Sequence, residues 1–242
     1  MILIATKTVL NSDSVPQSIN LGGSDIKFAN TVHNLGVRLD PTLSFQHHIS
    51  TVCCICYLEL RQISAICHYL SKDVTKKLLC MFILSRLDYC NSLSVGCPKY
   101  LLSKLQKVQN NAARLIFRTT RSAHVTPMLH SLHWLPVKQR IEYRLSLLCS
   151  EIISHQVPIY LSELLHFYTL SRQLCSSTDT RVFRIPSFRT KSCGQRFFSY
   201  QAPVIWNQLP VSVRHSTSVS SFKSSLKTFL LKNNNFSSVS LP

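Results

Sequence analysis

Acidic residues, glycine and long apolar runs are all scarce in this chain. Only 10 of its 242 residues are Asp or Glu, against 27 Lys and Arg, so the formal net charge is +17. That excess is too large to be neutralised within one fold, and its field attracts polyanions such as nucleic acids. The five glycines leave few sites for tight turns, which favours helices over a many-stranded barrel.

The longest apolar run, residues 78–84, is much shorter than the roughly 20 residues that span a bilayer. We therefore predict no transmembrane helix and no membrane partner. The first five residues lack the basic region and the long apolar stretch of a secretory signal. We expect a cytoplasmic or nuclear location, where the ten cysteines are reduced thiols.

The signatures of common catalytic centres are missing. Nucleotidyl transfer by two metal ions needs carboxylates that share cations about 4 Å apart, yet no two acidic residues are adjacent in the sequence. The sequence also lacks a phosphate-binding glycine loop with lysine, a Gly-x-Ser-x-Gly elbow and a His-Glu-x-x-His pair. We therefore expect this chain to have no catalytic residues, no cofactor and no small-molecule substrate.

Ten cysteines and ten histidines suggest a metal site, but their spacing does not. Structural zinc takes Cys pairs separated by two to four residues, twice over or with a His pair. Cys53, Cys54 and Cys56 are too crowded, and His130 and His133 have no Cys pair nearby. We interpret the cysteines as small buried hydrophobic residues and predict no metal.

Hydrophobic periodicity predicts short strands followed by helices. Residues 2–5 form a strand candidate, residues 19–21 and 26–28 flank Gly22-Gly23-Ser24-Asp25 as in a hairpin, and residues 32–39 form a third strand. After Leu43 the apolar period changes from two to about 3.6. We expect helices at 49–67, after Ser71, from Pro98, from Pro136, at 196–208 and at 218–231. The predicted fold is mainly α with a small N-terminal β-hairpin region.

The helix after Pro98 combines an apolar stripe with basic residues. Its stripe is Leu101, Leu105, Val108, Ala112 and Leu115, and the basic residues mostly off it are Lys104, Lys107, Arg114, Arg118 and Arg121. One face can pack while the other contacts phosphates. An ordinary solvated face is the alternative, but between Lys99 and Arg144 the one acidic residue is Glu142. Further candidate contacts downstream are Arg184, Arg189, Lys191 and Arg196.

Aromatic residues are interspersed with these charges. Exposed rings could stack on unpaired bases. We interpret Phe197 and Trp206, and also Trp134, as core residues, and we expect Tyr89 to pack.

Several blocks occur in a specific order along the chain. They are Asn34-Leu35-Gly36-Val37-Arg38-Leu39-Asp40 with Leu43-Ser44-Phe45, Ser85-Arg86-Leu87-Asp88-Tyr89-Cys90-Asn91, Leu132-His133-Trp134-Leu135-Pro136-Val137 and Trp206-Asn207-Gln208-Leu209-Pro210. Together they resemble the part of a LINE-type (non-LTR) retrotransposon reverse transcriptase that follows the catalytic palm, in the jockey and chicken-repeat group. The resemblance covers nearly the whole chain.

The resemblance implies four regions. Residues 1–42 correspond to the end of the palm, in which Leu35, Gly36 and Val37 match a primer-grip strand. Residues 43–155 correspond to a helical thumb-like bundle, 156–195 to a basic Ser/Thr/Arg-rich linker, and 196–242 to a small basic helical module. The implied partners are RNA or DNA, as a template–primer duplex or element RNA.

The aromatic-x-Asp-Asp turn of reverse transcriptases is absent from the sequence. The resemblance therefore implies a catalytically incomplete fragment of an RNA-directed DNA polymerase that retains a nucleic-acid-binding surface. Met1 is then an internal methionine of a truncated copy. Two alternatives stay open: a pseudogene product without function, and a protein-interaction module reused by the host.

Overall fold

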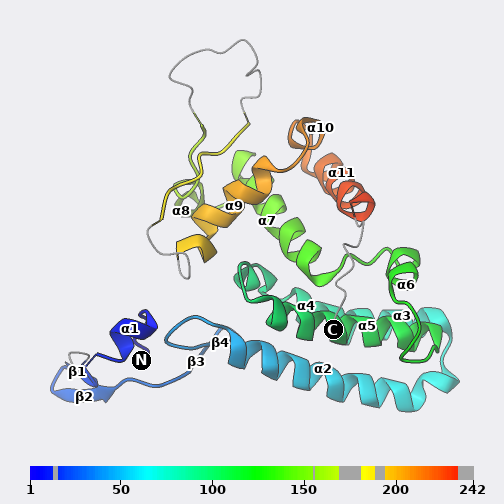
Figure 1. Ribbon diagram of the computed structural model, residues 1–242, viewed down its shortest axis with the longest axis horizontal. Helices are drawn as coiled ribbons and strands as arrows, with labels where there is room; N and C mark the ends of the chain where they lie inside the picture. The colour runs from blue at the N-terminus through cyan, green and yellow to red at the C-terminus, as the bar shows by residue number, and fades with distance from the viewer. Residues whose placement is uncertain (13–15, 155, 169–180, 189–193, 234–242) are drawn as a thin grey trace, which may run out of the picture. The chain divides into compact units, whose positions relative to one another are not determined.

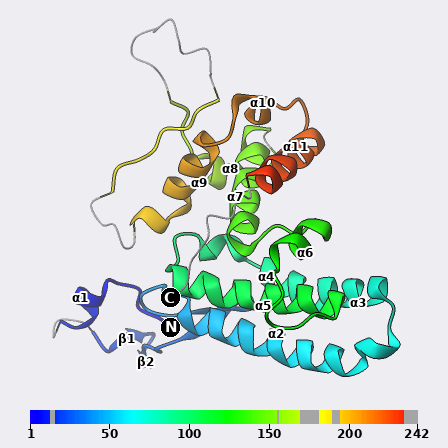
Figure 2. The same cartoon turned by 45° about the vertical axis from the view of Figure 1, so that its right-hand side comes forward.

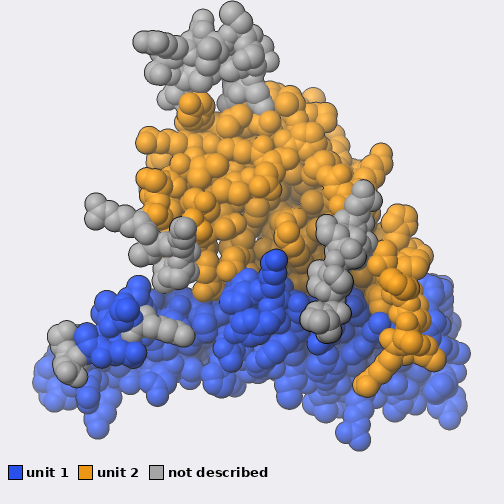
Figure 3. All heavy atoms as spheres, in the orientation of Figure 1, with its two compact units in different colours: residues 1–90, 97–119 blue, residues 91–96, 120–242 orange. Residues whose placement is uncertain are grey.

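The computed structural model describes residues 1–12, 16–154, 156–168, 181–188 and 194–233. The fold is mainly helical, with small two-stranded hairpins near the N-terminus, as predicted (Figure 1). Contacts divide the chain into two compact units, which Figure 3 shows in different colours. Unit 1 contains residues 1–90 and 97–119, and unit 2 contains residues 91–96 and 120–242.

Unit 1 begins with a short helix and two antiparallel hairpins. Helix α1 spans Lys7–Leu10, the first hairpin pairs β1 (Ser18–Leu21) with β2 (Ser24–Lys27), and the second pairs β3 (Val32–Asn34) with β4 (Val37–Leu39). Gly22 and Gly23 form the first turn with positive φ angles, so the predicted hairpin is confirmed. Residues 2–5 are not a strand, because they form single backbone bonds such as Ala5 N–H to Pro41 O (3.0 Å) and no ladder.

The predicted strand over 32–39 is two strands instead of one. Leu35 (φ 45°) and Gly36 (φ 77°) both adopt the left-handed conformation, and two such residues in succession reverse the chain in a tight hairpin turn. Asn34 then pairs with Val37 across the turn.

The helices of unit 1 pack around α2 (Gln46–Ile66) and α5 (Lys99–Phe117), which lie side by side in Figures 1 and 2. Between them along the chain come η1 (Cys67–Tyr69), α3 (Lys72–Leu79), the π-helical turn η2 (Cys80–Leu84) and α4 (Ser85–Asp88). The Ser71 hydroxyl accepts a hydrogen bond from Val74 N–H (3.3 Å) and caps α3, as predicted. The buried face of α2 is formed by Ile49, Cys53, Cys56, Leu60 and Ile63.

One described helical stretch, Gln46–Tyr69, is long and apolar enough to cross a membrane by length and composition. The sequence reading missed it because its apolar residues are interrupted by polar ones. A core helix meets the same criteria, and this one packs against α5. The expected lack of a membrane partner stays a prediction.

Unit 2 has its core around α7 (Val137–Ile153), α9 (Phe198–Asn207) and α11 (Val219–Lys232). Its other elements are η3 (Asn91–Ser94), α6 (Thr126–Ser131), α8 (Ile159–Ser162), η4 (Gly194–Arg196) and α10 (Val211–Arg214). The core includes Leu147 and Cys149 of α7, Trp206 of α9, and Phe222 and Leu226 of α11. Helix α7, which we had assigned to the bundle 43–155, thus packs with the C-terminal helices. The four-region division itself stays a prediction.

Candidate nucleic-acid interface

Helix α5 presents a line of basic side chains opposite a well-packed face. Lys104 and Lys107 are exposed, and Arg114 is half-buried with its Nη1 donating to Asn111 Oδ1 (3.4 Å). Spacings of three and seven residues place the three on one side of the helix. The opposite side is buried through Leu101, Leu105, Val108 and Ala112. We call Lys104, Lys107 and Arg114 the basic ridge.

Arg118 has a structural role in unit 1, and its predicted nucleic-acid contact stays a prediction. It ends α5 in the left-handed conformation (φ 50°). Its Nη2 donates to Cys67 O (2.9 Å) and Leu70 O (3.0 Å), the carbonyl groups where α2 and η1 end. Because free carbonyls at a helix end need donors, Arg118 fastens the end of one helix to the end of another.

Lys72 is a basic residue near α5 that the sequence reading overlooked. Its ammonium lies 3.9 Å from the centroid of the Phe117 ring, a cation–π contact. Phe117 follows Arg114 by three residues, so Lys72 adds positive charge to the C-terminal end of α5. The sequence pattern could not reveal this contact, because 45 residues separate Lys72 from Phe117.

The other predicted basic residues belong to unit 2 or lie outside the described residues. Arg121 is exposed beyond the end of α5 and belongs to unit 2. Arg184 is exposed, and its N–H donates to His166 O (2.8 Å) beside the isolated bridge between Phe167 and Phe183. Arg196 is half-buried in η4, where its side chain packs closely over Gly96. Arg189 and Lys191 lie outside the described residues, as do residues 169–180 and 189–193 of the predicted linker.

The structure brings two of the ordered blocks together at the Leu35-Gly36 turn. The Tyr89 hydroxyl donates to Leu35 O (2.6 Å), and a Cβ on Gly36 would lie 3.2 Å from Tyr89 Cε1. Glycine is therefore favoured by its positive φ, and a Cβ here would have to displace the Tyr89 ring by a few tenths of an ångström. Leu35 is 82% exposed whereas Val37 is buried. Tyr89 is itself 53% exposed, so the expectation that it packs holds only for the edge of the ring that faces Leu35 and Gly36.

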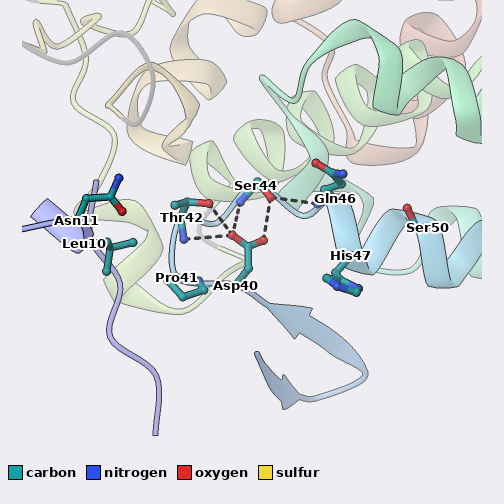
Figure 4. A pocket seen from close by; sticks show the side chains of 9 residues that line it. All are labelled: Leu10, Asn11, Asp40, Pro41, Thr42, Ser44, Gln46, His47 and Ser50. Atoms are coloured by element: carbon teal, nitrogen blue, oxygen red, sulfur yellow. Dashed lines mark hydrogen bonds between the residues drawn. The ribbon is translucent and has the colours of Figure 1, made fainter. Parts of the chain in front are cut away.

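Asp40, in the first block, organises the loop before α2. Its Oδ1 accepts from Thr42 N–H (3.1 Å), Thr42 O–H (2.8 Å) and Ser44 N–H (2.9 Å), and its Oδ2 accepts from Ser44 O–H (3.1 Å) and Phe45 N–H (2.9 Å), as Figure 4 shows in part. Partial burial acts to raise the pKa of Asp40, but the hydrogen bonds from these three residues outweigh it and hold the pKa below its ordinary value.

This hydrogen-bonded loop contains backbone that is costly for ordinary residues. Leu43 (φ 50°) and Phe45 (φ 57°) both adopt the left-handed conformation, which costs on the order of 1 kcal/mol or more each. The bonds to Asp40 offset that cost and let α2 begin at Gln46. An open pocket of about 590 Å³ lies beside the loop, lined by Leu10, Asn11, Asp40, Pro41, Thr42, Ser44, Gln46, His47 and Ser50.

The last block, Trp206 to Pro210, fixes a distant segment to α9. The side-chain amide of Asn207 makes two hydrogen bonds to the backbone of Phe183. Its Oδ1 accepts from Phe183 N–H (3.0 Å), and its Nδ2 donates to Phe183 O (2.8 Å). Trp206 Nε1 donates to Arg181 O (2.8 Å), and the Trp206 ring is buried, as predicted. Buried Arg214 donates to Leu209 O (3.0 Å). We call these contacts the Asn207 clamp.

Core and surface assignments of the remaining aromatic residues are mixed. Trp134 is buried, as predicted. Phe197 is 52% exposed, so its assignment to the core is wrong. The helix that we expected from 196 begins only at Phe198, and Phe197 precedes it with extended backbone. Its ring is therefore not on the helical face that carries Trp206.

The cysteines in the described part of the chain are free thiols. Burial raises the pKa of Cys56 to about 11, and it raises the pKa of fully buried Cys149 as well. The expectation of buried cysteines is wrong for Cys54, which is exposed. Among the described residues, no group of three or more His, Cys, Asp or Glu side chains could hold a metal ion.

Comparison with known protein families, with curated proteins and with solved structures finds no match.

Proposed function

We propose that this chain is a catalytically incomplete fragment of a LINE-type RNA-directed DNA polymerase that binds nucleic acid through the basic ridge. The observation that carries the proposal is the ridge itself: Lys104, Lys107 and Arg114 on one side of a helix whose other side is anchored in a core. The resemblance to the family rests on the ordered sequence blocks, and the ridge is the surface that we propose contacts nucleic acid.

Length and charge suit the ridge to a phosphate backbone. From Lys104 to Arg114 a helix advances about 15 Å, and each strand of a duplex carries one phosphate per 3.4 Å or so of the duplex axis. Unit 1 has 13 Lys and Arg against six Asp and Glu, so its net charge of +7 favours the same partner. The proposed contact is with phosphates and is therefore independent of base sequence.

The binding test compares two double variants of equal charge. Fluorescence anisotropy with a labelled RNA hairpin and a primer–template duplex, over a salt series, measures wild type, Lys104→Ala/Lys107→Ala and the control Lys27→Ala/Lys77→Ala. Both control lysines are exposed residues of unit 1 outside α5. We expect micromolar or tighter binding in wild type, and for the ridge variant a salt slope lower by about 2.

Two results would contradict the proposal. One is an equal loss in both double variants, which would mean that net charge alone drives the association. The other is wild-type binding no tighter than that of an unrelated basic protein. A primer-extension assay with Mg²⁺ or Mn²⁺ tests the catalytic part, for which we expect no incorporation; reproducible incorporation by the purified chain would refute it.

A further inference from the structure

Three aromatic rings of unit 2 gather at its surface, apart from the buried core. Phe188 lies 6.1 Å from Phe197 and 6.0 Å from Tyr200, measured between ring centroids. Phe188 is 38% exposed and Phe197 is 52% exposed, while Tyr200 is half-buried. We call these three residues the aromatic cluster.

Local backbone geometry holds the cluster in place. A Cβ on Gly194 would lie only 2.6 Å from Phe188 Cβ, so only glycine lets η4 approach the ring this closely. Phe197 precedes α9 and accepts from Tyr200 N–H (3.1 Å) and Gln201 N–H (3.0 Å). Its ring is thus presented at the beginning of a helix whose Ala202 and Trp206 are anchored in the core.

Positive charge near the cluster in sequence favours a negatively charged partner. Arg184 is exposed four residues before Phe188, and Arg196 directly precedes Phe197. After Asp179 the sequence contains nine Lys and Arg and no acidic residue. An exposed apolar cluster indicates an interaction site, and in so positive a segment the complementary partner is a polyanion that also offers flat apolar faces.

We propose that the aromatic cluster stacks on unpaired bases of a single-stranded nucleic acid. Every base has a π face, so stacking on exposed rings tolerates any sequence, while nearby arginines attract the phosphates. The proposal shares with the proposed function only the class of ligand. It concerns different residues, a different unit and the bases instead of the backbone.

The test uses oligonucleotides that differ only in their bases. A labelled 12-nucleotide pyrimidine strand and an abasic strand with the same phosphates are titrated against wild type, Phe197→Ala, Phe197→Trp and Tyr160→Ala. Tyr160 is the matched control, because it is 65% exposed in unit 2 and lies outside the cluster. A circular dichroism melt of each variant checks that the fold is retained.

We expect wild type to bind the base-bearing strand more tightly than the abasic strand. Phe197→Ala should weaken the first roughly five- to tenfold and leave the second unchanged, a loss typical of one stacked base. Phe197→Trp and Tyr160→Ala should keep the preference. The ridge variant Lys104→Ala/Lys107→Ala should weaken both strands equally, which separates failure of the ridge from failure of the cluster.

Equal affinity of wild type for the two strands would overturn the proposal, as would an unchanged preference in a folded Phe197→Ala variant. A protein partner whose capture resists nuclease and high salt, and is lost in Phe197→Ala, would reassign the cluster to protein binding.

Discussion

A single arginine at the end of α5 joins segments that are about 50 residues apart in sequence. Replacing Arg118 by Ala removes two charged hydrogen bonds to the carbonyls of Cys67 and Leu70. We expect the free energy of unfolding to fall by about 1–2 kcal/mol, measured by urea unfolding followed by circular dichroism. Lys107→Ala, which removes an exposed charge, should change it little. A stable Arg118→Ala variant that loses RNA affinity would contradict the structural role.

Asp40 makes the stability of unit 1 depend on pH. Its folded pKa is lowered by the loop hydrogen bonds, so its contribution is fully present above the unfolded pKa of about 3.9 and is lost as pH falls through the folded pKa. Asp40→Asn should therefore reduce stability at pH 7 by about 0.5–1 kcal/mol, a small value because the carboxylate is partly exposed and screened by solvent, with a smaller difference at pH 3. Urea unfolding at both values measures this, and a difference that stays constant with pH would exclude the carboxylate as the cause.

For single residues, roles that depend on neighbouring positions could be predicted from the sequence, whereas contacts with residues far along the chain could not. Ser71 before a helix and Trp206 within an apolar stripe have their reasons within a few neighbouring positions. The carbonyl contacts of Arg118 were missed because its acceptors lie 51 and 48 residues away. Phe197 was misread because α9 begins two residues later than predicted, which leaves Phe197 in extended backbone before the helix.

Among the elements, the Asn207 clamp links α9 to the segment around Phe183. Asn207→Ala removes both bonds to the Phe183 backbone, and we expect a loss of about 1–3 kcal/mol. Hydrogen exchange at the Phe183 amide should become faster, and Asn207→Asp, which keeps only the acceptor, should be intermediate. Gln208→Ala, at an exposed neighbour, is the control; an unchanged Phe183 amide in Asn207→Ala would mean that the clamp contributes nothing.

Element types were largely predictable, whereas their ends and partners were not. The period of 3.6 and the caps located α2, α3, α5, α7, α9 and α11. The hairpin of β3 and β4 was read as one strand because apolar alternation continues through a turn that only the φ angles of Leu35 and Gly36 reveal. For the site, helical periodicity placed Lys104, Lys107 and Arg114 off the apolar stripe of α5, but it could not reveal the contact of Lys72 with Phe117.

For the whole molecule, the division into two units predicts separate responses to core damage. Leu226→Ala in unit 2 should cost about 2–5 kcal/mol and speed alkylation of Cys149, while Cys56 in unit 1 stays protected. Leu101→Ala in unit 1 should speed alkylation of Cys56, while Cys149 in unit 2 stays protected. The side chains of Leu101, Leu226, Cys56 and Cys149 are all fully buried. The raised pKa values of the Cys56 and Cys149 thiols keep them unreactive when the protein is folded. Mass spectrometry of the alkylated protein measures each site, and simultaneous exposure in either variant would mean one cooperative unit.

The chain has two tryptophans, Trp134 and Trp206, and both are buried in unit 2. Intrinsic tryptophan emission therefore reports on unit 2 alone, whereas the helical signal in circular dichroism comes from both units. If the two probes unfold at different denaturant concentrations, the earlier transition can be assigned to one unit without any added label. If the units unfold separately, a dye-free fluorescence screen would overlook unit 1 variants, including those of the basic ridge.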